Sequence, residues 1–282
     1  MTLRVTPLSP GFGAEASGVD LAQPLSEPAF RAIEQAFFAA QVLVLRAQKL
    51  TAAQFVEFAR RLGPPEPHVI DQFHHPEHAD ILILSNRRAN GEPVGLADAG
   101  TYFHTDYSYL DVPARCTTLY SIEVPGKGGD TLFANQYLAW EALSDGLKRL
   151  LEKLVGVNLS AKADVSRTRE DRIKSDGRDA APREYVGEHP VARTHPETGR
   201  KALYVNVAHT ARFKGMTDEE SAPLLEFLFR HQVRPEFTCR FTWQTGSIAL
   251  WDNRCAQHNP VNDYHGHRRL MHRITLAGDR PR

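Results

Sequence analysis

The sequence predicts a mainly β protein with flanking helices around a double-stranded β-helix, or jelly-roll, core. Many short runs of branched and aromatic residues are separated by turn residues, such as the stretch from Pro125 to Gly129. Amphipathic helical segments are few and do not alternate with these runs. Short strands punctuated by turns favour a sandwich or jelly roll, whereas strict alternation would have favoured a parallel α/β fold.

The expected strands share a high content of valine, isoleucine, leucine, threonine and aromatic residues. They occupy residues 42–45, 81–84, 117–124, 131–134, 202–207, 237–243, 247–251 and 273–277.

Helices are expected in four places. The first covers residues 27–41, with Ser26 as its N-cap. The second opens at a capping box formed by Thr51 and Gln54 and stops at Gly63. A third covers residues 140–154, and a fourth opens at a second capping box that starts with Thr217.

The chain of 282 residues is expected to form one domain over residues 1–282. Residues 161–190 are rich in charge and poor in large apolar side chains, so they cannot bury much surface. We expect a mobile loop there, either a solvated insertion or a lid over a site.

Composition excludes several classes of partner. Lys+Arg and Asp+Glu are 34 each, so a general nucleic-acid or anionic-membrane surface is not expected. No apolar run is long enough to cross a bilayer, and the N-terminus lacks the apolar core of a secretory signal. The three cysteines lack zinc-type spacing, which favours a reducing cytoplasm. The chain is further expected to form a homo-oligomer, a dimer or a tetramer.

A His-x-Asp pair, His104 and Asp106, is the first chemical signal. In an extended segment these two side chains point to the same side. A second histidine from a distant strand would complete a set of two histidines and one carboxylate. That set leaves three metal positions open and is the signature of non-haem Fe(II) oxygenases. His258, which follows the apolar run 247–251 and leads into a loop, is the candidate.

Other histidines compete for that role. His265 and His267 lie in a polar turn and are expected to be solvated. His272 lies on the strand that follows and is expected to be a core or interface residue.

That strand carries two arginines. Arg269, Met271, Arg273 and Thr275 share one face by alternation, and the two guanidinium groups lie roughly 13 Å apart. If this face lines a cavity, each buried cation needs an anion. The alternative is an edge strand with both arginines in solvent.

At this point the motifs resemble the taurine / 2,4-dichlorophenoxyacetate dioxygenase family over nearly the whole chain. The matching segments are GFGAEASGVDL, VLVLRAQKLTAAQFVEFARRLG, FHTDYSY, VPGKGGDTLFAN, HPETGRKALYVN, WDNRCAQH and RRLMHRITLAGDRP. The resemblance implies a dioxygenase that uses Fe(II), 2-oxoglutarate and O2. It would hydroxylate a small anionic substrate while 2-oxoglutarate is decarboxylated to succinate and CO2.

The resemblance also implies residue roles. His104, Asp106 and His258 match the iron ligands. Arg269 and Thr131 match the residues that hold the far carboxylate of 2-oxoglutarate.

On the substrate side, Arg273 and His68 match positions that bind the substrate's anionic group. Gly100 and Asp71 depart from the taurine-binding members, so the substrate could be a sulfonate, a sulfate ester, an aryloxy-carboxylate or an amino-acid-type molecule.

Two other classes of function fit the same triad. A zinc hydrolase can use two histidines and an aspartate with an open position, and it would be active without oxygen. A non-catalytic 2-oxoglutarate-binding protein on the same fold would be favoured by a lost ligand, and no ligand is lost here.

Overall fold

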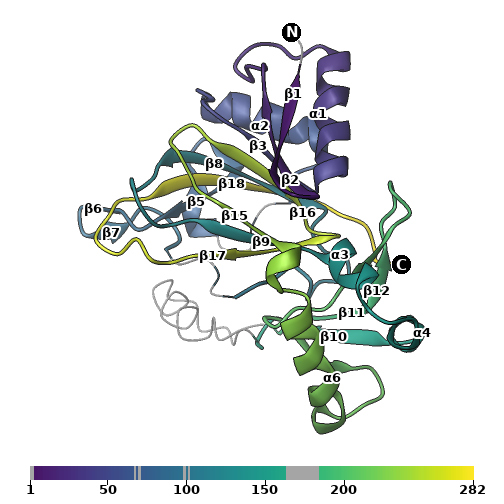
Figure 1. The fold of residues 1–282 in the computed structure, drawn as a ribbon. Helices are drawn as coiled ribbons and strands as arrows, with labels where there is room; N and C mark the ends of the chain where they lie inside the picture. Colours follow the sequence, from purple (N-terminus) through teal and green to yellow (C-terminus); the bar gives the residue numbers. More distant parts are fainter. Residues whose placement is uncertain (1–2, 67, 69–70, 98–99, 101, 163–183) are drawn as a thin grey trace.

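Two β-sheets face each other across a shared apolar core (Figure 1). The computed structural model describes residues 3–66, 68, 71–97, 100, 102–162 and 184–282. The large sheet has the order β1 (Arg4–Ser9), β2 (Phe12–Ser17), β3 (Val42–Leu45), β16 (Ile248–Asp252), β8 (Cys116–Glu123), β18 (Leu270–Leu276), β5 (His78–Ser85) and β4 (His74–His75). The small sheet has the order β15 (Thr238–Phe241), β9 (Thr131–Asn135) and β17 (Ala256–Pro260).

The space between the sheets is filled by side chains from both. Leu119 and Trp251 from the large sheet belong to the same buried cluster as Phe133 and Phe241 from the small one. The expectation of a mainly β protein with helices is therefore confirmed.

Helices α1 (Glu27–Ala40) and α2 (Ala52–Leu62) cover the outer face of the large sheet. Ser26 and Thr51 cap them through their side chains, and Thr51 forms the expected capping box with Gln54. The apolar stripes of both helices pack on alternate residues of the strands, such as Ile274 of β18. The opposite residues of each strand are thereby left to face the small sheet.

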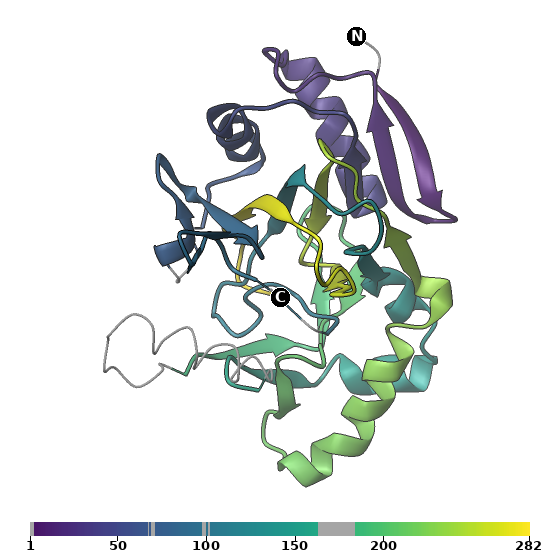
Figure 2. The same cartoon turned by 90° about the vertical axis from the view of Figure 1, so that its left-hand side faces the viewer.

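A third layer lies at the other end of the molecule, with α6 (Asp218–His231) far from α1 in both views (Figures 1 and 2). It contains the sheet β11 (Val186–Pro190), β10 (Val155–Leu159) and β14 (Thr210–Phe213), together with the hairpin β12 (Ala192–Thr194) and β13 (Lys201–Leu203). The short pair β6 (Arg88–Ala89) and β7 (Glu92–Pro93) completes the described strands.

The single helix expected over residues 140–154 is wrong. Two shorter helices occupy the region, α3 (Gln136–Glu141) and α4 (Asp145–Leu151). Asn135 accepts hydrogen bonds from two backbone amides and starts α3 early, and Ser144 caps a second start. Two side-chain caps thus divide a stretch whose apolar spacing reads as continuous.

Three other boundaries also differ from expectation. The strand over 202–207 is confined to β13, because Asn206 turns the chain by donating its amide to Thr210 Oγ1. The run at 237–243 begins with a 3-10 turn, Pro235–Phe237, and the strand ends at Phe241. Residues 186–190 of the expected loop form β11, paired with β10. Residues 163–183 lie outside the described part.

A buried ionic cluster fixes the turn between β16 and β17. Arg254 reaches Asp252 through Nε (2.8 Å) and Nη2 (2.7 Å), and Glu197 through Nη1 (2.6 Å). The Thr198 amide donates to His195 Nδ1, so the Nε2 proton of His195 can donate to Asp252 at 2.9 Å. The pKa of Arg254 is raised, because the attraction of the two carboxylates outweighs burial.

Removing the Arg254 side chain is expected to leave the Asp252 carboxylate buried without its cation. Arg254→Ala should lower the free energy of unfolding by about 3–5 kcal/mol, measured by urea denaturation. Arg31→Ala is the matched control, because Arg31 also binds two carboxylates but on an exposed helix face. Equal free energies of unfolding for the two variants would show that the buried ionic cluster stabilises the protein no more than the exposed ion pairs of Arg31.

Candidate metal centre

The two histidines of the centre are joined by their backbones. His104 and His258 exchange a pair of N–H···O bonds, each 3.0 Å long, in an isolated antiparallel bridge. Their rings lie 4.1 Å apart between centroids. His258 is on strand β17 opposite Phe133 of β9, so the expectation that it leads into a loop is wrong. A strand holds the ring more firmly than a loop would.

Asp106 completes the group. Its Oδ1 lies 3.6 Å from His104 Nε2 and 3.9 Å from His258 Nε2. One ligand atom from each residue falls within 4.8 Å of the others. Donors that bind one small divalent ion at about 2.1 Å must stand about this close, so the donor set fits such an ion. Two imidazoles and one carboxylate are the set that non-haem Fe(II) uses.

The protonation states suit metal binding. His104 Nδ1 lies 2.8 Å from the Tyr102 carbonyl, which favours the tautomer with its proton on Nδ1 and a lone pair on Nε2. Burial lowers the pKa of both imidazoles, and repulsion from His104 lowers that of His258 further. Burial would raise the pKa of Asp106, but the Arg273 guanidinium and the imidazoles hold it well below its usual range.

Arg273 faces this centre from β18. Its Nη2 is 2.7 Å from Asp106 Oδ1, and its side chain is 11% exposed. Met271, two residues earlier, belongs to the core between the sheets, so this face of β18 points inward. The alternative of solvent-facing arginines is therefore wrong for Arg273. The sequence alone could not identify Asp106 as the ion-pair partner of Arg273, because the two residues lie far apart in the chain.

Arg269 and Thr131 are both buried. The Arg269 guanidinium lies over the ring of Tyr264 at 5.3 Å, and Tyr264 packs beside Gly129, two residues before Thr131. Thr131 is opposite Pro260 on β17, so it shares a face with His258. Thr131 Oγ1 accepts a hydrogen bond from Trp243 Nε1 at 3.0 Å.

His68 is half-buried, and its ring lies 6.1 Å from that of Tyr107. The competing histidines are elsewhere. His265 and His267 are exposed, whereas His272 is on the other face of β18, where its ring lies 5.4 Å from that of His75.

Sequence reasoning did not single out several side chains around the centre. Tyr107 follows Asp106 with a left-handed backbone (φ 57°), and its side chain is buried. His209 lies edge-on to His104 at 6.4 Å and to Tyr109 at 4.9 Å, and burial lowers its pKa to about 3. A strained residue next to a ligand is a recurrent mark of a functional site.

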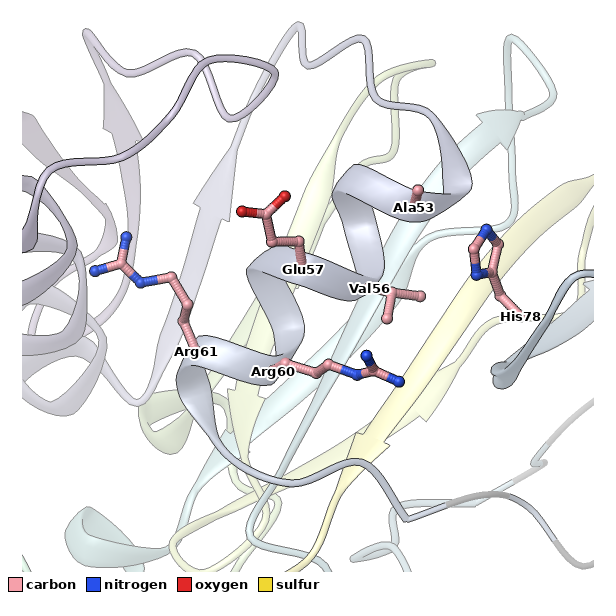
Figure 3. A pocket seen from close by; sticks show the side chains of 6 residues that line it. All are labelled: Ala53, Val56, Glu57, Arg60, Arg61 and His78. Carbon is pink, nitrogen blue, oxygen red and sulfur yellow. The ribbon is translucent and has the colours of Figure 1, made fainter.

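Two other features in the described part of the chain are weaker candidates for a functional site. A cavity of about 440 Å³ lies against α2 and His78 (Figure 3), but Arg60 on its wall is paired with Asp80. His195, Asp252 and Cys255 also lie close enough together to hold an ion, but the guanidinium of Arg254 already neutralises Asp252.

Gly100 lies directly against the first histidine. Its φ is +91°, and a Cβ there would stand 2.8 Å from His104 Cε1 and 3.2 Å from Pro260 Cγ. Any side chain at this position must therefore displace the imidazole or the residue behind it. Residue 100 is also the position noted from sequence as a departure from the taurine-binding members.

We expect Gly100→Ala to weaken divalent-metal binding by roughly tenfold or more, as loss of the support behind a ligand generally does. Gly91→Ala is the matched control, because Gly91 has φ +87° but no atom within 4 Å of its Cβ position. Both variants carry a backbone strain of about 1 kcal/mol. Equal metal affinities, measured by calorimetric titration, would contradict the steric role of Gly100.

Comparisons with known proteins agree with this geometry. The family model described as "Taurine catabolism dioxygenase TauD, TfdA family" matches residues 4–275. An alpha-ketoglutarate-dependent sulfate ester dioxygenase of Pseudomonas putida is 32% identical over 100% of this chain and 91% of that protein. An alpha-ketoglutarate-dependent 2,4-dichlorophenoxyacetate dioxygenase of Cupriavidus pinatubonensis is 31% identical over 99% of both.

A solved structure shows the same likeness in three dimensions. The taurine dioxygenase from Burkholderia xenovorans superimposes with a TM-score of 0.83 at 34% identity, over 99% of this chain and 90% of that one. The fold, the clustered donor set and these matches lead to one conclusion: the chain belongs to the taurine catabolism dioxygenase TauD, TfdA family of non-haem iron, 2-oxoglutarate-dependent enzymes.

Proposed function

We propose that this dioxygenase hydroxylates a small anionic organic substrate at a metal centre formed by His104, Asp106 and His258. The observation that carries the substrate class is Arg273, a buried cation 2.7 Å from the carboxylate oxygen that faces both imidazoles. When bound, Fe(II) and 2-oxoglutarate supply the oxygen chemistry, and 2-oxoglutarate is converted to succinate and CO2.

The three ligands provide one negative charge and two neutral nitrogens. Because only three protein groups would bind, an octahedral ion held there would keep three positions open. A cosubstrate that chelates with two atoms needs two of them, and O2 needs the third. The protein's own contribution is to hold the ligands rigidly and to exclude water from this face.

Arg269 and Thr131 are proposed to hold the far carboxylate of 2-oxoglutarate. A guanidinium binds a carboxylate through two parallel hydrogen bonds, which fix its orientation as well as its charge. Thr131 Oγ1 accepts from the indole of Trp243, so its own proton is available for donation. Both side chains are buried, which strengthens these interactions.

Arg273 and His68 are proposed to bind the substrate's anionic group. Once Asp106 Oδ1 is shared with a metal ion, the Arg273 charge has to be balanced by a further anion. The named relatives act on a sulfate ester and on an aryloxy-carboxylate, and both of these carry a negative charge. We therefore propose a sulfate ester, a sulfonate or an aryloxy-carboxylate as the substrate.

Several wider features remain proposals. The two facing sheets are proposed to form a double-stranded β-helix within one domain over residues 1–282. No helix in the described part of the chain is long and apolar enough to cross a membrane. A cytoplasmic location is supported by three buried cysteines that form no disulfide. Assembly as a dimer or tetramer would be measured by light scattering.

A substrate panel tests the proposed function. Succinate release should be measured with Fe(II), 2-oxoglutarate and O2 for hexyl sulfate, taurine, 2,4-dichlorophenoxyacetate and neutral hexanol. We expect at least one anion to reach a kcat/KM of about 10⁴ M⁻¹s⁻¹, with hexanol far below it. His258→Ala should abolish the reaction, since one of only three protein ligands is lost. Preferred turnover of hexanol would overturn the substrate class.

Substitutions of Arg269 and Arg273 are expected to weaken the binding of different reactants. Arg269→Ala should weaken 2-oxoglutarate binding by about 3–5 kcal/mol, the usual cost of removing one partner of a buried ion pair. Arg273→Gln should weaken binding of the anionic substrate much more than that of 2-oxoglutarate. Dissociation constants measured without oxygen report both effects directly.

Arg268→Ala is the control for charge alone, because Arg268 is exposed and adjacent to Arg269. It should leave both dissociation constants within about twofold of the wild type, since an exposed charge contributes little. A loss of 2-oxoglutarate binding in Arg273→Gln equal to that in Arg269→Ala would show that the two roles are not divided.

A further inference from the structure

The two oxygens of the Asp106 carboxylate have different surroundings. Oδ1 faces both imidazole Nε2 atoms and Arg273. Oδ2 accepts a hydrogen bond from the Thr117 hydroxyl at 2.6 Å. A carboxylate can bind a metal through one oxygen or through both, so this asymmetry bears on how Asp106 binds.

Thr117 is placed for this contact by the large sheet. On β8 it is paired with Thr275 of β18 on one side and with Trp251 of β16 on the other. Cross-strand partners share a face, so Thr117 is on the inner side with Arg273. Its side chain is completely buried, and water therefore cannot replace the hydroxyl as a partner of Oδ2.

Asn253 fixes the direction of the hydrogen bond. The Asp106 amide donates to Asn253 Oδ1 at 3.3 Å, which identifies the other end of the Asn253 side chain as the donor. That Nδ2 donates to Thr117 Oγ1 at 3.0 Å. Because Thr117 accepts there, its single proton is committed to Asp106 Oδ2. The three residues close a ring of hydrogen bonds.

We propose that Thr117 and Asn253 are positioning residues that restrict Asp106 to binding the metal through Oδ1 alone. The inference rests on the proposed metal centre and deepens it. A hydrogen bond to a charged oxygen is about twice as strong as one between neutral groups, so releasing Oδ2 is costly. Holding Oδ2 away keeps a third metal position open.

The consequence concerns 2-oxoglutarate. With Asp106 bound through one oxygen, a six-coordinate ion has two positions for the cosubstrate and one for O2. If Oδ2 also bound, the carboxylate would compete with the chelating cosubstrate for a position. Thr117 would therefore act on 2-oxoglutarate binding through the Asp106 carboxylate, to which it is hydrogen-bonded.

Thr117→Val tests this, because valine keeps the shape and removes the hydroxyl. The first readout is the absorption spectrum of the Co(II)-loaded protein, which changes with the number of ligand oxygens. The second is the 2-oxoglutarate dissociation constant, titrated without oxygen through the visible charge-transfer band of the Fe(II) chelate. We expect an altered Co(II) spectrum and a dissociation constant roughly tenfold higher or more.

Thr118→Val is the matched control. Thr118 is the next residue on β8 and is equally buried, but it is paired with Ile274 and Leu250 and faces α1 and α2. Its Oγ1 has no hydrogen-bond partner in the described part of the chain. Thr118→Val should leave both readouts unchanged, and Thr117→Ser, which restores a hydroxyl, should return them towards the wild type.

The outcomes are distinguishable. If the wild type forms no Fe(II)–2-oxoglutarate chelate, the proposed function itself is wrong. If the wild type forms the chelate and Thr117→Val matches it in both readouts, the positioning role is wrong. Weaker metal binding with normal 2-oxoglutarate affinity per bound metal would also overturn it. Thr117→Ala provides the same measurements should the valine variant not fold.

Discussion

The candidate metal centre depends on the contacts that keep the buried carboxylate of Asp106 ionised. A lone carboxylate at this depth would take up a proton, and it would then be a poor ligand. Arg273, two imidazoles and the Thr117 hydroxyl keep it ionised, so their contribution is electrostatic before it is catalytic. The same charge explains why a guanidinium can lie inside an apolar sandwich, since each ion compensates the other.

The packing of the sheets and helices, more than the local sequence, brings these charged groups together. Helices α1 and α2 bury one side of the large sheet, and the opposite residues of β8 and β18 are thereby directed at the small sheet. Alternate residues along each strand therefore either pack against the helices or face the candidate metal centre. The ionic cluster around Arg254 then fixes the turn that leads into β17, and with it the placement of His258.

The parts of the structure that were predictable from sequence carry local signals. The starts of the capped helices are predictable because Ser26, Thr51 and Thr217 each cap the first turn with their side chains. The proximity of His104 and Asp106, whose Nε2 and Oδ1 lie 3.6 Å apart, is predictable because an i, i+2 spacing places both side chains on one side. The β1–β2 hairpin is not predictable in this way, because β1 is mostly exposed and lacks an apolar pattern. The Thr117–Asn253 ring carries no local signal, because the two bonds that Asn253 makes join residues more than one hundred positions apart.

The backbone bridge between His104 and His258 has a further consequence. The imidazoles are attached to the edge of the small sheet, whereas Asp106 is tied by Thr117 and Arg273 to the large one. An ion bound by all three would span the two sheets and act as a cross-link between them. The bound cation would then limit relative movement of the two sheets at the metal centre. Residues that line the substrate region could differ between relatives without weakening this cross-link.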